Sequence, residues 1–365
     1  MSEIKSETTK TLKVGVIGCG SIGQHGHIPG FQNAGVEIAA VVDSNLQRAQ
    51  EVATKMNIPD AYDNYKKLLK RKDIDLVSIG LPNVLHAPVA IDALKAGKHV
   101  LCEKPMTITA ALAKKMIAAQ QKSGKLLSIN QHMRFTPEGQ IMRKAFEEGQ
   151  LGEVYLADMR WTRQTGIPGY GGWFTNKDLA GAGASFDIGV HLLDFAMFVT
   201  GFPEIASVKG YLSDRLGKQR IGLGGWGIDR QQEGRFDVDD TCMMTVTAKS
   251  GLQIRVLVTW AAFVPHEQRM SFFGDKGGAD CDAERYGKDT PVRFYAAGED
   301  GQIKDSTPDL SSYVGGGWLK AISSFVSAVK GESPLMVLPE QTLITTRILE
   351  LAAKSAATGK EVPFS

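Results

Sequence analysis

The sequence predicts an α/β protein of two domains: an N-terminal doubly wound parallel sheet, then an α/β domain with a mainly antiparallel sheet. The chain has 365 residues, more than one typical hydrophobic core requires. Strands and helices alternate in its first third, which is typical of a parallel sheet. Several strands between residues 208 and 274 follow one another without helices, which is typical of an antiparallel sheet. We expect a flexible tail at residues 1–12 and domains at 13–133 and 134–365.

The composition excludes several classes of protein. The chain is 43% hydrophobic and 22% charged, with a net charge of +2, so a nucleic-acid partner is not expected. No apolar run is expected to reach the length of a membrane span, and the polar first ten residues do not resemble a secretion signal. The cysteines form no CxxC pair or metal-ligand spacing, so we expect neither a metal site nor disulfides: Cys19, Cys102, Cys242, Cys281. These features favour a cytoplasmic protein.

The N-terminal half alternates short apolar runs with amphipathic segments. We expect strands at residues 13–18, 36–42, 75–80, 98–102 and 125–130. We expect helices at residues 46–56, 62–71, 84–96 and 108–122. Because ligands bind at the carboxyl ends of the strands in such sheets, polar residues that follow these strands are candidates for a site.

A glycine motif follows the first strand. Gly18, Gly20 and Gly23 form GxGxxG between a strand and a helix. Gly18 permits a tight turn, Gly20 lets a pyrophosphate approach the backbone, and Gly23 lets the helix and strand pack closely. The N–H groups at the helix N-terminus attract phosphate. The motif predicts dinucleotide binding, which would also involve Ser21 and Ile22.

Asp43 ends the second strand, 20 residues after Gly23, where a carboxylate is expected to accept a hydrogen bond from a ribose 2′-hydroxyl. The alternative role is an N-cap for the helix that starts near Leu46, but neighbouring Ser and Asn residues could also cap it. A carboxylate repels a 2′-phosphate, and the nearest arginine, Arg48, lies one helical turn further on. We therefore predict NAD in preference to NADP.

Polar residues follow the next three strands. Lys104 stands at a strand end and is followed by Pro105; its alternative role is a solvated surface lysine or a partner of Glu103. His86 is predicted to lie near the cofactor at a helix N-terminus rather than to be a catalyst. The segment at residues 131–135 follows the last strand. The further candidates for cofactor binding are Leu81, Pro82, Asn83, His86, Glu103 and Lys104.

The segment at residues 185–199 predicts an almost wholly apolar and therefore buried helix. Its polar exceptions, Asp187, His191 and Asp194, are spaced four and three residues apart and so lie on one stripe. Unpartnered polar groups are costly to bury. The stripe therefore indicates either a satisfied internal network or a reaction site.

Five motifs in this order, GCGSIG, VVD, LPNVLH, CEKP and GAGASFDIGVH, resemble the glucose–fructose oxidoreductase/inositol dehydrogenase (Gfo/Idh/MocA) family of sugar and polyol dehydrogenases. The resemblance runs from Lys13 to the final TGKEVPF. It implies an NAD-binding Rossmann domain and a second domain for substrate binding and oligomer contact, with a homo-tetramer or homo-dimer. It also implies that Lys104, Asp187 and His191 are catalytic.

The C-terminal half predicts a helix at residues 137–148, a strand at 152–163 and helices at 316–329 and 340–357. Further strands are expected at residues 208–211, 241–248, 253–261 and 269–274. The C-terminal helix is a candidate for packing back on the first domain. Glycine-rich loops at 165–173 and 222–227 carry aromatic residues, which can stack on sugars, pack the loops or contact another subunit. The candidates for substrate binding are Arg134, Trp161, Arg163, Tyr170 and Trp173.

These features predict an NAD-dependent dehydrogenase of a sugar, sugar derivative or cyclic polyol. We expect His191 to take the hydroxyl proton and Lys104 to stabilise charge on the oxygen. Asp187 would accept hydrogen bonds from substrate or Lys104, and Asp194 would either hold the imidazole tautomer or cap a neighbouring element. One alternative is a redox-neutral glycosidase or lyase that acts through a keto-sugar. Another is a non-catalytic NAD-binding regulator, which would not need Lys104, Asp187 and His191 together.

Overall fold

The computed structural model describes residues 11–227, 233–313 and 316–364, so residues 1–10 of the expected tail lie outside the described part. The first sheet is wholly parallel, with the strand order β3-β2-β1-β4-β5-β6. The order reverses between β1 and β4, which places a binding crevice at their carboxyl ends. The strands are β1 (Lys13–Ile17), β2 (Glu37–Val42), β3 (Asp60–Tyr62), β4 (Leu76–Ile79), β5 (His99–Cys102) and β6 (Leu127–Ile129).

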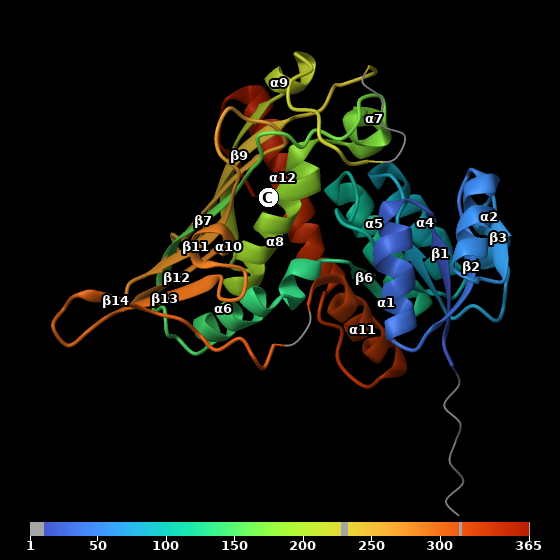
Figure 1. Cartoon of the computed structure of the whole chain (residues 1–365), viewed down its shortest axis with the longest axis horizontal. Coiled ribbons are helices and arrows are strands. Elements are labelled where there is room, and N and C mark those ends of the chain that lie inside the picture. Colours follow the sequence, from blue (N-terminus) through green and yellow to red (C-terminus); the bar gives the residue numbers. More distant parts are fainter. Residues whose placement is uncertain (1–10, 228–232, 314–315, 365) are drawn as a thin grey trace, which may run out of the picture.

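Helices cover both faces of this sheet (Figure 1). α3 (Tyr65–Leu69), α4 (Asn83–Lys95) and α5 (Ala110–Ser123) share one apolar cluster. The opposite cluster contains residues of α1 (Ile28–Asn33) and α2 (Leu46–Lys55). A π-helical turn, η1 (Gly23–His27), precedes α1. Because both faces are covered, the strands other than the edge strand β3 are almost entirely buried, as their continuous apolar sequences indicate.

The predicted helix at residues 62–71 is wrong in part. The structure has a three-residue edge strand, β3, and then a short helix, α3, which Asn64 caps by accepting from the backbone N–H of Lys66. Three residues are too few for the alternation that identifies a strand in sequence. The other predicted strands and helices of this half are confirmed, with their ends shifted by one or two residues.

The second sheet has nine strands in the order β14-β13-β12-β11-β7-β10-β9-β8-β15. Every neighbouring pair is antiparallel except β7 and β10, which confirms a mainly antiparallel sheet. The strands are β7 (Val154–Thr162), β8 (Ile205–Ser213), β9 (Thr241–Ala248), β10 (Gln253–Thr259), β11 (Glu267–Gly274), β12 (Gly277–Asp282), β13 (Val292–Ala297), β14 (Ile303–Ser306) and β15 (Val362–Pro363). The sequence did not predict β12 to β15; of these, β12 begins with two glycines, and β14 and β15 have four and two residues.

One face of this sheet is covered by helices and the other is open. α8 (Val190–Val199), preceded by the π-helical turn η4 (Ser185–Gly189), and α12 (Pro339–Thr358) lie between the two sheets (Figure 1). The apolar cluster beneath them includes residues of both helices and of the sheet. The other described helical segments are η2 (His132–Phe135), α6 (Pro137–Glu147), η3 (Trp173–Thr175), α7 (Lys177–Ala180), α9 (Arg215–Lys218) and α10 (Ala283–Tyr286).

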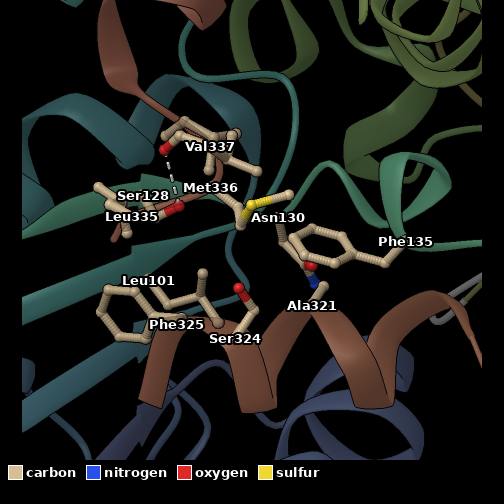
Figure 2. Close-up of a pocket in the computed structure, with 11 residues that line it drawn as sticks. Leu101, Ser128, Asn130, Phe135, Ala321, Ser324, Phe325, Leu335, Met336 and Val337 are labelled. Carbon is tan, nitrogen blue, oxygen red and sulfur yellow. Dashed lines mark hydrogen bonds between the residues drawn. The ribbon is translucent and has the colours of Figure 1, made fainter. Parts of the chain in front are cut away.

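The helix α11 (Gly317–Lys330) packs on the first sheet, although it lies late in the sequence. Its Ile322, Phe325 and Val326 belong to the apolar cluster of α1 and α2. Figure 2 shows a small cavity between α11 and strands β5 and β6, with a volume of about 10 Å³. Such a cavity holds at most about one water molecule. α11 is therefore closely fitted to the first sheet.

The helical stretch Lys177–Val199 corrects the expectation that no segment has the length and hydropathy of a membrane span. It passes both criteria, but 83% of its apolar window is buried inside the protein. Core helices meet the same two criteria, and α8 is the central helix of the second domain.

Candidate active site

A large cleft of about 1130 Å³ lies where the carboxyl ends of the first sheet face η4 and α8. It brings together most of the site residues that the sequence predicts. The predicted residues that line it are Gly18, Gly20, Ser21, Ile22, Asp43, Arg48, Leu81, Pro82, Asn83, Glu103, Lys104, Trp161, Arg163, Trp173, Asp187 and His191.

Two glycines of the motif, Gly18 and Gly23, are packed too tightly to be replaced by residues with side chains. Gly18 has φ +109°, and a Cβ atom there would lie 2.1 Å from the carbonyl oxygen of Gly80, which follows β4. A Cβ at Gly23 would lie 2.1 Å from the carbonyl oxygen of Gly18. Gly23 itself does not line the cleft, so its role is the close packing of the helix against the strand.

The Asp43 carboxylate is held at the rim of the cleft. It accepts hydrogen bonds from the backbone N–H groups of Cys19 (3.1 Å) and Asn45 (2.9 Å), and the Arg48 guanidinium lies 3.8 Å away. Asn45 is the residue that caps α2, so Asp43 is not required as a cap. A glycine cradle, a helix N-terminus and a fixed carboxylate in one cleft fit an NAD-type dinucleotide.

A buried network fixes the loop that carries Lys104. Glu103 Oε1 lies 2.9 Å from His27 Nε2 and accepts from Asn130 Nδ2 at 2.7 Å, and Ser78 contacts the other nitrogen of His27 at 2.9 Å. The backbone N–H of Lys104 donates to Glu103 Oε2. Burial alone would raise the pKa of Glu103, but its hydrogen bonds and the nearby positive charge hold that pKa at about 2. Glu103 is therefore a carboxylate that positions its neighbour.

Lys104 and Asp187 connect the two domains. Lys104 Nζ donates to the backbone oxygen of Asp187 at 2.8 Å and to its Oδ1 at 3.0 Å. The other carboxylate oxygen, Oδ2, accepts from the indole N–H of Trp260 at 2.8 Å. Asp187 lies in η4, and π-helical turns occur frequently at functional sites. The predicted contact of Asp187 with Lys104 is present.

His191 is buried beside this ion pair, and its Nδ1 has no hydrogen-bond partner among the described residues. Burial lowers the pKa of His191 well below 6.5, and the positive charges of Lys104 and Arg163 lower it further. The imidazole is therefore neutral at pH 7. A neutral imidazole with a free nitrogen can accept a proton.

The expectation that Asp194 holds the tautomer of His191 is wrong. Both Asp194 oxygens accept from the Arg134 guanidinium, at 2.8 and 2.7 Å, and both side chains are 1% exposed. Arg134 also donates to Gln341 of α12 at 2.6 Å. Arg134 does not line the cleft, so the structure does not bring it to the predicted substrate site. A bidentate contact neutralises two charges that would be costly to bury separately.

The predicted substrate residues are divided between cleft and core. The Trp161 ring lies 6.5 Å from that of His191, and the Arg163 guanidinium lies 4.7 Å from the Trp161 ring centroid. Tyr170 is 1% exposed, packs against Phe236 and does not line the cleft. The structure therefore brings Trp161, Arg163 and Trp173 to the cleft but places Tyr170 in the core.

Two predicted cofactor residues tie segments together. Asn83 lines the cleft and donates to the backbone oxygen of Ala180 in the second domain at 2.8 Å. His86 does not line the cleft; its ring nitrogens lie 2.8 and 2.9 Å from the backbone oxygens of Pro105 and Leu81. His86 thus holds together two loops at the cleft edge without facing it.

Sequence reasoning missed two residues that lie beside His191 and the Lys104–Asp187 pair, and one that supports η4. His132 lines the cleft, its ring centroid lies 4.7 Å from that of His191, and burial lowers its pKa to about 4. Its position after the last parallel strand was a signal, but the prediction selected Arg134 from that segment. No sequence motif pointed to Trp260 or Asp239. Asp239 accepts from the backbone N–H groups of Gly183 and Ser185 and so anchors the start of η4.

Comparison with known proteins agrees with this geometry. Residues 12–131 match the Gfo/Idh/MocA oxidoreductase family with an NAD-binding Rossmann fold, and residues 140–280 match a Gfo/Idh/MocA C-terminal domain. D-glucoside 3-dehydrogenase of Escherichia coli (strain K12) is 31% identical over 360 residues, 97% of this chain and 98% of that protein. Inositol 2-dehydrogenase of Salmonella typhimurium is 36% identical over 164 residues, 44% of this chain and 48% of that protein.

A solved structure of levoglucosan dehydrogenase in complex with NADH has the same fold. Its TM-score is 0.82 at 23% identity, covering 98% of this chain and 100% of that chain. Its likeness extends over both sheets of the present structure. The chain therefore belongs to the Gfo/Idh/MocA family and is an NAD-binding oxidoreductase.

Proposed function

We propose that this protein is a dehydrogenase that oxidises a secondary hydroxyl of a glucoside or a related sugar derivative with NAD. The observation that carries the proposal is the Lys104–Asp187 ion pair beside neutral, unpartnered His191 in the cleft that contains the glycine motif. The relative that matches 97% of the chain is named as a glucoside dehydrogenase, which supports this substrate class.

The proposed roles follow from charge and position. NAD, when bound, supplies the hydride acceptor that no side chain provides. His191, which lines the cleft, accepts the hydroxyl proton on its imidazole, because the ring is neutral at pH 7. Lys104, oriented by Asp187, donates a hydrogen bond to the oxygen on which negative charge develops. Trp161 offers a face to the sugar ring, and Arg163 offers donors to its hydroxyls.

The direct test is NADH absorbance with purified protein, NAD and a panel of methyl and phenyl glucosides, free aldoses, inositols and anhydrosugars. We expect glucosides to give the highest kcat/KM. NADH formed only from inositols would contradict the glucoside assignment. No NADH with any sugar, combined with NAD that co-purifies tightly, would indicate the redox-neutral alternative, and the same result without any sugar binding would indicate the regulator.

We propose that the enzyme prefers NAD to NADP because the fixed Asp43 carboxylate lines the cleft. Replacing Asp43 by Ser removes one charged acceptor, so we expect the Kd for NAD to rise about tenfold and the Kd for NADP to fall. Fluorescence titration with both cofactors measures this change. A wild-type Kd that is lower for NADP than for NAD would disprove the preference.

We also propose that copies of the chain associate as a dimer or tetramer through the open face of the nine-stranded sheet. This face exposes Tyr155, Tyr211, Met243 and Phe273 beside charged residues such as the Arg255–Asp158 pair. A cytoplasmic location remains our proposal, and the four buried free cysteines are compatible with a reducing compartment. Sedimentation analysis of wild type and Tyr211→Glu tests the contact surface, since a new charge there should favour smaller species.

A further inference from the structure

Three aromatic side chains from the glycine-rich loops line the cleft: Trp173, Phe174 and Trp226, here called the aromatic wall. Trp173 and Phe174 stack with ring centroids 3.7 Å apart. Phe174 and Trp226 meet edge to face at 5.1 Å. The three rings therefore form one continuous apolar surface in the cavity that also contains Lys104 and His191.

The two loops that carry the wall are bound to one another. The indole N–H of Trp226 donates to the backbone oxygen of Gly166 at 2.8 Å. The backbone N–H groups of Gly166 and Ile167 both donate to Gly222, and Gly224 donates back to Ile167. A Cβ at Gly224 would lie 2.9 Å from the Cα of Gly166, so glycine permits the loops to approach. The wall is therefore held in place by backbone contacts before any ligand binds.

Two of the three rings of the wall lie outside the hydrophobic core. In the described part of the chain, Trp173 and Trp226 belong to none of the clusters of buried apolar residues, whereas Phe174 packs against the core of the second domain. Large aromatic rings left half-buried in a cleft gain free energy when a ligand covers them. Their position is thus typical of a binding surface.

The wall lies beyond the residues that face the reacting sugar. Among the described residues, the ring of His191 contacts those of His132 and Trp161 and none of the wall. Trp161 and Arg163 already offer a face and donors beside His191. A second sugar ring would need polar partners for its hydroxyls, and the indole N–H of Trp226 is already used by Gly166. A flat apolar group suits the wall better.

We propose that the aromatic wall is a subsite for an aromatic aglycone, so that the preferred substrate is an aryl glucoside rather than a free sugar or an inositol. This inference rests on the proposed glucoside dehydrogenase function and adds the group attached to the sugar. The aglycone stacks on Trp173 and meets Trp226 at its edge while the sugar lies beside Trp161.

The test is calorimetric binding of phenyl β-D-glucoside and methyl β-D-glucoside to the NADH-saturated protein, where no turnover occurs. We expect phenyl glucoside to bind about tenfold more tightly, the effect of one good aromatic contact. Trp173→Ala and Trp226→Ala should reduce this preference to less than about threefold, because each removes a ring that contacts the aryl group. The matched control is Phe263→Ala, an aromatic residue that is 83% exposed and lies outside the cleft.

Equal affinities of the two glucosides for the wild type would overturn the subsite, as would a preference that survives in folded Trp173→Ala. If cellobiose binds as tightly as phenyl glucoside, the subsite accepts a second sugar ring, and the assignment to an aryl group is wrong. Trp226→Phe keeps a ring without the loop hydrogen bond and replaces Trp226→Ala if that variant does not fold. A tenfold preference for phenyl glucoside in binding, without any NADH formation in the separate turnover assay, would support the subsite and contradict the proposed dehydrogenase function.

Discussion

Lys104, Asp187 and His191 gain their proposed roles from one another. Lys104 is fixed from its own domain by Glu103 and from the other domain by Asp187. The nearby positive charge then helps to keep His191 neutral. A cation that stabilises an oxygen beside a neutral base is the pair that oxidation of an alcohol requires.

Replacing Lys104 by Ala should lower kcat by about 10²- to 10³-fold, because the oxygen loses its charged donor. Replacing His191 by Ala should lower kcat by about 10²- to 10⁴-fold, because the proton acceptor is lost. The Kd for NAD should change little in either variant. Steady-state kinetics and cofactor titration measure these effects, with His266→Ala, which is paired with Glu284 on the surface, as the histidine control. A larger effect on NAD affinity than on kcat would make Lys104 a cofactor ligand.

The activity should persist to unusually acidic pH for a histidine base. Burial and nearby cations lower the pKa of His191 well below 6.5, so protonation removes the base only at a pH well below 6.5. The acidic limb of the kcat/KM profile should therefore lie below pH 6.5. An acidic limb at or above pH 6.5 would contradict the assignment of His191 as the base. The variant His132→Asn tests whether the neighbouring ring of His132 changes the pH dependence of kcat/KM.

At the scale of elements, the cleft is built from the starts of helices. η1 follows the glycine loop, and η4 begins where Asp239 binds the backbone N–H groups of Gly183 and Ser185. The buried Arg134–Asp194 pair then joins η2 to α8, close behind His191 in sequence. The side chains of Asp239, Arg134 and Asp194 do not line the cleft. Their contacts fix η4 and α8, the helix that carries the proposed base.

Removing one partner of the Arg134–Asp194 pair should destabilise the protein by about 3–5 kcal/mol, because a buried charge is left alone. We expect Arg134→Met and Asp194→Leu each to show this loss in urea unfolding. The double variant should lose less than the sum of the two, since neither charge remains. Additive losses would show that the two side chains do not stabilise each other.

At the scale of the whole molecule, buried neutral histidines make stability depend on pH. Burial lowers the pKa of His132 to about 4 and that of His191 well below 6.5, the value expected in the unfolded chain. The contribution of these histidines to the free energy of unfolding is fully present above pH 6.5. It is lost as the pH falls toward the folded-state pKa, because the unfolded chain then binds more protons than the folded protein.

Each such histidine should cost about 1.4 kcal/mol of stability per pH unit below 6.5. We expect the urea midpoint to fall between pH 7 and pH 5. His191→Asn should reduce this fall compared with the wild type. An unchanged pH dependence in His191→Asn would show that this histidine is not neutral in the folded protein.

The local pattern of the chain was enough to predict the parallel sheet, the strands β7 to β11 of the second sheet and much of the cleft. Gly18, Gly23 and Asp43 are recognised because their roles depend on neighbours within one strand–turn–helix unit. The sequence shows that Asp187, His191 and Asp194 lie on one stripe of a helix. It does not show which of them face the cleft, since helical spacing gives the alignment of side chains and not their partners. Its first two members lie in the cleft, and the third binds Arg134.

The sequence by itself determined the fold class, the family and the principal residues of the site, because these depend on periodicity and on motifs of adjacent residues. Only the tertiary structure decided which polar groups meet across the two domains. In the folded chain, Lys104 binds Asp187, which lies 83 positions away in the sequence, and the indole N–H of Trp260 donates to the same carboxylate. Arg134 and Tyr170 lie in the core. The physical reason is that a buried polar group takes the partner that folding brings within hydrogen-bond distance, wherever that partner lies in the chain.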